Sequence, residues 1–125
     1  MPAQVEKALA AASPDEQQVR EVARMFALLG DPTRVSVLQV LAAAGELCVS
    51  DLARVLGRDA STISHQLRVL RDERLVTHER RGRIATYRLA DSHVLTLFQQ
   101  AMAHAAHQMP IPLPLVGASL VKEVR

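Results

Sequence analysis

The sequence predicts a mainly α-helical domain with a small β-hairpin wing, and three observations support this fold class. Apolar residues recur at helical spacing between proline and glycine signals over most of the 125 residues. The stretch 75–89 instead alternates on either side of Arg81-Gly82, as two short strands would. A short helix, a tight turn and a second helix come directly before this hairpin, an order typical of a winged helix-turn-helix.

Four residues mark the first predicted helix of this domain. Ser13 suits the N-cap, Pro14 the first helical position and Glu16 the end of a capping box. Gly30 is a helix stop signal. Residues 1–12 carry no clear start signal, so we expect a flexible N-terminal segment there.

Three further helices follow, each with its own signals. The second is predicted between the cap Asp31 and Gly45, the third over 47–57, and the fourth over 59–75 with Asp59 as its cap. Apolar side chains at helical spacing should join the third helix to the fourth. These side chains are Leu52, Val55, Ile63 and Leu67.

The last helix is predicted over 92–108, with Asp91 as its cap. Prolines after it prevent the helix from continuing, so we expect 109–125 to be a mobile tail. The winged helix-turn-helix domain therefore spans 13–108. Its core must consist of short aliphatic side chains, since aromatic residues make up 2% of the chain, and oligomerisation often stabilises such small domains.

Positive charge gathers in the middle of the chain, although the net charge is only +2. Residues 54–88 hold nine arginines against four acidic residues, whereas residues 1–53 hold seven acidic residues against four basic ones. A basic surface of this kind points to an anionic partner such as nucleic acid. The alternative is a solvated charged face that binds nothing.

The predicted fourth helix and the hairpin carry the side chains that would contact double-stranded DNA. Short hydrogen-bonding side chains near the start of a helix let it lie deep in the major groove. The candidate base contacts are Ser61, Thr62, Ser64 and His65. Arginines farther along the helix and at the hairpin tip would contact phosphates or the minor groove. They are Arg68, Arg71, Arg80, Arg81 and Arg83.

The last helix carries three of the five histidines, but they are too far apart to bind one ion within a chain. His93 and His104 lie about 16 Å apart along the helix axis, whereas zinc ligands lie about 2 Å from the metal. If two copies pack antiparallel, Asp91 and His93 of one face His104 and His107 of the other. Each of the two resulting sites would suit tetrahedral Zn(II).

This metal hypothesis includes a packing expectation and leaves alternatives open. The apolar side chains expected between the two helices are Val94, Leu95, Phe98 and Met102. Co(II) and Ni(II) remain alternatives to zinc, because metal selectivity depends on geometry and availability. The simpler interpretation is that these histidines are exposed, or buried and hydrogen-bonded.

Cysteine usage and hydropathy suggest where the protein acts. The single cysteine, Cys48, excludes an intramolecular disulfide and fits a reducing cytoplasm. The N-terminus lacks the pattern of a secretory signal, and no uncharged apolar run is long enough to span a membrane. We therefore expect a cytoplasmic protein without a membrane partner.

Most of the chain, roughly residues 19–107, resembles the ArsR/SmtB family of bacterial metal-sensing repressors. The similarity rests on "LGDPTRVSVLQVL", "GELCVSDLARVLG", "STISHQLRVLRDERLVTHERRGRIATYRL" and "DSHVLTLFQQAMAHAAH". It implies a winged-helix homodimer, joined through its first and last helices, that releases operator DNA when metal binds. The family's base-contacting residues correspond to Ser61, Ser64 and His65, and its wing to 80–83.

The resemblance also implies the type of metal site. The zinc-sensing branch carries D-x-H-x₁₀-H-x₂-[HE] on the last helix, shared between two subunits. The residues that match this pattern are Asp91, His93, His104 and His107. By the same resemblance, His104 would donate a hydrogen bond to a backbone carbonyl near Arg74, which would link the metal site to the DNA-binding unit. Thiolate sites of other branches need two or more cysteines, so we expect Cys48 to be a small buried residue.

Two other function classes remain open. A zinc enzyme usually keeps one metal position open beside a general base, and the chain has no H-E-x-x-H motif, so we expect no enzyme. A helix-turn-helix regulator with a structural metal, or with none, is the closer alternative. The expected partners are operator DNA and a second copy of the chain, without a small organic ligand.

Overall fold

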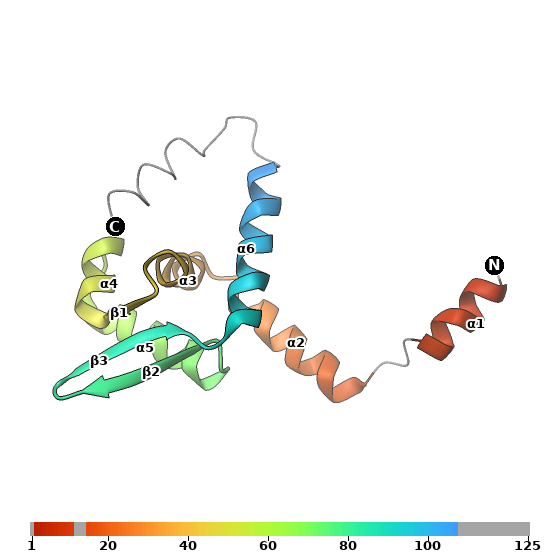
Figure 1. Ribbon diagram of the computed structural model, residues 1–125, viewed down its shortest axis with the longest axis horizontal. Coiled ribbons are helices and arrows are strands. Elements are labelled where there is room, and N and C mark those ends of the chain that lie inside the picture. The colour runs from red at the N-terminus through yellow and green to blue at the C-terminus, as the bar shows by residue number, and fades with distance from the viewer. Residues whose placement is uncertain (1, 12–14, 108–125) are drawn as a thin grey trace.

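The computed structural model describes residues 2–11 and 15–107, which form six helices and three strands (Figure 1). The helices are α1 (Pro2–Ala11), α2 (Glu16–Leu28), α3 (Pro32–Ala44), α4 (Val49–Leu56), α5 (Ala60–Asp72) and α6 (Ser92–His107). The strands are β1 (Glu46–Cys48), β2 (Val76–Arg81) and β3 (Ile84–Leu89). This order confirms the predicted fold class. None of the described helices is long and apolar enough to cross a membrane.

Aspartate side chains cap three helices at the predicted positions. Each carboxylate accepts a hydrogen bond from the backbone N–H three residues later, as an N-cap does. The distances are 3.0 Å for Asp31, 3.3 Å for Asp59 and 3.0 Å for Asp91. These caps place the starts of α3, α5 and α6 where the sequence predicted them.

The start of α2 differs from the prediction. Its N-cap is Asp15, whose carboxylate accepts from the backbone N–H groups of Gln17 and Gln18 at 3.0 and 3.3 Å. A carboxylate satisfies these two free donors and also interacts favourably with the positive end of the helix dipole. Ser13 and Pro14, which were expected to start the helix, lie outside the described residues.

The structure describes most of the N-terminal segment but not the predicted C-terminal tail. Residues 2–11, within the segment expected to be flexible, form the helix α1, and the side chains of residues 3–11 are exposed. The flexibility of this segment stays a prediction. The predicted tail, 109–125, lies outside the described residues.

The sheet has three antiparallel strands in the order β1-β3-β2. The predicted hairpin is confirmed, with a two-residue turn at Gly82-Arg83 in which Gly82 has a φ of 65°. Strand β1 was not predicted. Residues 46–48 pair with 86–88 of β3, so α4 begins at Val49 rather than at the predicted residue 47.

The core lies where α3 meets α4, α5, α6 and the start of the hairpin (Figure 1). Its buried residues are Val37, Leu38, Leu41, Leu52, Ala53, Ile63, Leu67, Leu70, Leu75, Val76 and Phe98. The set includes Leu52, Ile63 and Leu67, which were predicted to join α4 to α5. Val55 was assigned wrongly, because its side chain is 44% exposed.

Cys48 is not the buried residue that the sequence suggested. It lies at the end of the edge strand β1, is half-buried, and its Sγ is 3.3 Å from the hydroxyl oxygen of Ser50. The pairing of β1 with β3 explains this position, because it brings Cys48 to the sheet edge rather than into a helix facing the core.

Candidate DNA-binding surface and metal-ligand helix

Helices α4 and α5 form a helix-turn-helix whose second helix has one face in the core and the other in solvent. Gly57 ends α4 in the left-handed conformation, with a φ of 64°. The buried face of α5 consists of Ile63, Leu67 and Leu70. The exposed residues of α5 include Ser61, Ser64, His65 and Arg68, while Thr62 is half-buried. Most of the predicted base contacts are therefore accessible.

Asp59 binds the hydroxyl groups of two predicted base contacts. Ser61 Oγ and Thr62 Oγ1 donate to its two carboxylate oxygens at 2.5 and 2.6 Å. The hydrogen bond from Ser61, then those from Thr62, lower the pKa of Asp59 from 3.8 to about 2. Each hydroxyl has a single proton, which it already uses in the hydrogen bond to Asp59. In this conformation each hydroxyl can therefore only accept a hydrogen bond from a further partner such as DNA.

Arg71 connects α5 with the hairpin. Its Nη1 lies 3.4 Å from each ring nitrogen of His78 on β2. The His78 ring stacks on Tyr87 of β3, with centroids 5.5 Å apart. Sequence reasoning missed this group, although His78 and Tyr87 are direct cross-strand neighbours in the hairpin that it predicted.

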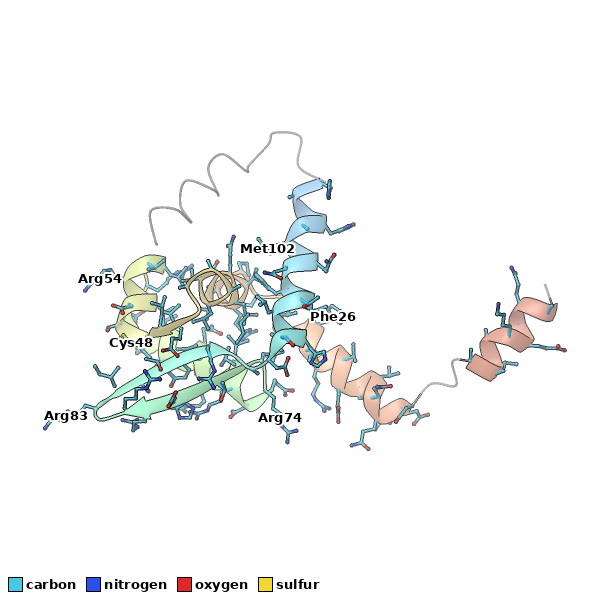
Figure 2. All side chains as sticks on the ribbon, in the orientation of Figure 1. Phe26, Cys48, Arg54, Arg74, Arg83 and Met102 are labelled. Atoms are coloured by element: carbon cyan, nitrogen blue, oxygen red, sulfur yellow. The ribbon has the colours of Figure 1, made fainter. Side chains whose placement is uncertain are left out.

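The three arginines predicted at the wing differ in their contacts. Arg81 forms ion pairs with Glu79 at 3.2 Å and with a glutamate of β1 at 3.9 Å. Arg80 and Arg83 are exposed and form no ion pair within the described part of the chain. Figure 2 shows Arg83 projecting from the hairpin tip on the same side of the molecule as Arg54 of α4. The side chains of Arg80 and Arg83 are thus accessible from solvent.

Helix α6 carries the candidate metal ligands on the face that points away from the core. His93, Leu97, Gln100 and His104 recur every three or four residues and are all exposed. His107 follows one turn later and is exposed too. The His93 side chain is 95% exposed, and its Nδ1 lies 3.6 Å from Asp91 Oδ1. Among the described residues of one chain, no three potential ligands lie close enough to hold an ion.

Three of the four apolar residues expected between two copies of α6 pack within their own protomer instead; Leu95 is half-buried and its place in the interface stays a prediction. Phe98 is only 6% exposed and belongs to the core of its own protomer, with Val94 and Met102 packed against that core. In Figure 2, Met102 points from α6 toward α3. The apolar face of α6 therefore packs against the core of the same protomer. The opposite face, with His93 and His104, is called the ligand face here, and its large apolar residue is Leu97, which is 36% exposed.

An open cleft of about 560 Å³ lies beside Asp91 and His93. Its walls come from α2, from the start of α6 and from the end of α5 with the residues that follow, including Arg74. Arg74 thus lies at the Asp91 end of α6, about three helical turns from His104 of the same chain. A contact between His104 and the backbone near Arg74 would therefore have to join two chains.

Helix α2 leaves an apolar stripe uncovered. Val19, Val22 and Phe26 follow one another at helical spacing and are 54%, 42% and 58% exposed. We call these three residues the α2 stripe. Figure 2 shows Phe26 close to the start of α6. A contiguous exposed apolar surface on a small domain is typical of a protein interface.

Comparisons with known proteins agree on one family. Residues 31–78 match the family model described as "Bacterial regulatory protein, arsR family". The chain is 44% identical over 87 residues to a transcriptional repressor SmtB homolog of Synechocystis, covering 70% of this chain and 65% of that protein. It is 42% identical over 93 residues to the transcriptional regulator NmtR of Mycobacterium tuberculosis, covering 74% and 77%.

A solved structure extends the similarity to the fold. It is a homodimeric winged helix-turn-helix DNA-binding domain from Mycobacterium bovis, described as a possible ArsR-family transcriptional regulator. The alignment has a TM-score of 0.68 and 31% sequence identity, and it covers 76% of this chain and 89% of that one.

Proposed function

The chain belongs to the arsR family of bacterial regulatory proteins, and from this premise we propose that it is a metal-responsive transcriptional repressor. In this proposal a homodimer binds operator DNA in the cytoplasm, and Zn(II) or a similar divalent ion bound between the protomers releases it. Relatives of the chain are transcriptional regulators. Family membership therefore confirms that the chain is not an enzyme.

The ligand face of α6 is the observation that carries this proposal. Asp91 and His93 lie at its start, and His104 and His107 at its end, all on residues that are exposed. Three imidazoles and one carboxylate suit Zn(II), and Co(II) and Ni(II) also bind imidazole. Because the two pairs are separated along one helix, a complete set requires the two ends of α6 to come from different chains.

The uncovered apolar surface supports the dimer. The α2 stripe and Leu97 of α6 belong to the two helices that would form the interface, whereas Phe98, Val94 and Met102 of α6 pack in or against the protomer core. A twofold axis beside α6 would bury this surface and bring the Asp91 end of each α6 to the His107 end of the other. The two metal sites and the dimer interface would thus form together.

The DNA-binding surface consists of α5 and the wing. A dimer would present two copies of α5 to two half-sites about one helical turn of DNA apart, so a small change of the angle between protomers would move both recognition helices. The exposed polar residues of α5 would contact bases, and Arg68, Arg80 and Arg83 would contact phosphates.

Metal and operator must weaken each other's binding by the same factor, because coupling between two sites is reciprocal. A metal-bound imidazole has a second nitrogen that needs an acceptor. We assign this acceptor, for His104, to the backbone near Arg74 of the other protomer, since Arg74 follows the recognition helix and lies beside the cleft at Asp91. Such a contact would tie metal binding to the position of α5.

The proposal is tested by adding metals to the protein bound to a labelled DNA fragment from its own upstream region. Zn(II), Co(II) and Ni(II) are titrated while fluorescence anisotropy reports bound DNA, with Mg(II), which prefers oxygen ligands, as the control. We expect at least one of the three metals to release the DNA and a chelator to restore binding. Equal operator affinity with metal and with chelator would instead leave a helix-turn-helix regulator with a structural metal or with none.

A further inference from the structure

A half-buried arginine connects the end of α2 with the recognition helix. Arg34, in the first turn of α3, donates from Nε to the backbone carbonyl of Leu28 at 2.8 Å and from Nη1 to Oε1 of Gln66 at 3.1 Å. Leu28 is the last residue of α2, and Gln66 lies in the middle of α5. One side chain therefore contacts two helices that lie far apart in the sequence.

The geometry of this contact makes it a stiff one. The backbone N–H of Arg34 is itself bound to the carboxylate of Asp31 at 3.0 Å, so the side chain starts from a capped helix turn. A guanidinium is planar and its donors diverge at fixed angles, so it holds its two acceptors in a set relative position. Bonds from a charged donor are also stronger than those between neutral groups.

The other polar contact between α2 and the region of α5 is weaker. Among the described residues it is the ion pair between Arg24 Nε and Glu73 Oε2, at 3.9 Å, whose side chains are 56% and 34% exposed. Exposed ion pairs of this kind contribute little, because water screens them. Of the polar contacts between these two regions, those of Arg34 therefore resist a shift of α2 relative to α5 best.

Both ends of this contact lie next to surfaces with a proposed role. Helix α2 carries the apolar stripe of the proposed dimer interface, and Gln66 directly follows the exposed base-contact candidates Ser64 and His65. The carbonyl of Leu28 is one of the last in α2, which have no partner inside the helix. A rotation of α2 relative to the rest of the protomer would thus pull on Gln66 through Arg34.

We propose that Arg34 and Gln66 form a positioning link that transmits the geometry of the dimer interface to the recognition helix. This inference rests on the proposed function, in which metal binding changes the relation between the two protomers. Neither residue contacts the metal ligands or needs to touch DNA. Their role is to make operator affinity depend on the position of α2.

The test compares variants of Gln66 in the full-length protein. Gln66→Leu removes the acceptor but leaves the bond from Arg34 to Leu28, and Gln66→Glu keeps an acceptor oxygen. Arg24→Met is the matched control, since it cuts the exposed contact between the same two regions. For each protein, operator affinity is measured by anisotropy with Zn(II) and with chelator, and zinc affinity by competition with a coloured chelator.

The readout is the ratio of the two operator affinities, which typically lies between about 5 and 150 for coupled sites. We expect Gln66→Leu to lower this ratio at least about fivefold, with a zinc affinity within about twofold of the wild type. Gln66→Glu and Arg24→Met should keep the wild-type ratio. A charge at position 66 can weaken DNA binding with and without zinc, but it does so equally and leaves the ratio unchanged.

Several outcomes would overturn the link. The link is wrong if Gln66→Leu keeps the wild-type ratio of the two operator affinities. It is also wrong if Gln66→Leu loses operator affinity equally with and without zinc, because that result is expected of a residue with only a structural role. An equal loss of the ratio in Arg24→Met or Gln66→Glu would also contradict it. A wild-type protein whose operator affinity ignores zinc would overturn the proposed function first, and the link with it.

Discussion

Mixing two defective variants tests whether each metal site is shared between two chains. His93 and His104 lie on the same exposed face of α6, about 16 Å apart along its axis, so neither can replace the other within a site. In a homodimer of His93→Ala or of His104→Ala, both sites lack one imidazole. In the heterodimer, one site lacks two imidazoles and the other keeps its complete ligand set.

The size of the effect follows from this arrangement. If equal amounts of the two variants are unfolded and refolded together, about half of the dimers should be heterodimers, each with one intact site of the two. The mixture should then bind about one quarter of the wild-type amount of tightly held metal, whereas each variant alone should bind almost none. His65→Ala, a histidine variant on α5, should bind the full amount.

The assay is a titration with Co(II), whose visible absorption reports tetrahedral coordination, followed by direct metal analysis after gel filtration. A mixture that holds no more metal than the pure variants would show that the sites do not span two chains in this way. If either pure variant binds the full amount of metal, the histidine replaced in that variant is not a metal ligand. Both results would leave the DNA-binding surface as the supported part of the function.

Other predictions follow from the burial and bonding of single residues. Ser64→Ala and His65→Ala should each weaken operator binding about tenfold in a gel-shift assay without changing the circular dichroism spectrum, because both side chains are exposed; normal binding by both would exclude α5 as the base-contacting helix. Phe98→Ala should lower the free energy of unfolding by about 3–5 kcal/mol in urea denaturation, because this ring is 6% exposed within one protomer. Leu97→Ala should mainly weaken dimer association in sedimentation equilibrium, and the opposite pattern would place Phe98 between the protomers. The pKa of Asp59 is lowered from 3.8 to about 2 in the folded state, so the ionised carboxylate stabilises the fold. This stabilisation is complete above pH 3.8 and is lost as the pH falls through about 2. The melting temperature of Asp59→Ala should therefore lie below the wild-type value at pH 6 and approach it as the pH falls from 4 to 2, whereas a difference that stays constant would contradict this assignment.

Local signals in the sequence were sufficient where a feature depends on neighbouring residues. The aspartates at 31, 59 and 91 cap their helices because a carboxylate needs only the N–H groups two or three residues later. The hairpin turn at Gly82 follows from the need for a positive φ between two alternating segments. The start of α2 was missed because two residues that can cap a helix, Ser13 and Asp15, lie two positions apart, and Asp15, the one nearer to α2, is the cap.

The face of α6 that is buried could not be predicted from its pattern. Apolar side chains lie on more than one side of this helix, so the type and spacing of Phe98 did not show whether it faces the core of its own protomer or a second copy of α6. The position of α6 against α3 settles the matter, because it turns Phe98 inward and leaves Leu97 with the histidines. The prediction that His93 and His104 share one face of α6 does not depend on which face is buried, because it used only their spacing along the helix.

The sequence by itself determined the order of the five helices from α2 to α6 and of the hairpin, the caps of three of these helices, and the fact that the four ligand candidates cannot meet within one chain. These features depend on distances along a single helix or turn, which the backbone sets. Only the tertiary structure decided that β1 joins the sheet, that Phe98 is a core residue and that Arg34 binds Gln66. Such contacts join segments far apart in the chain, and their energy depends on which surfaces are brought together and removed from water.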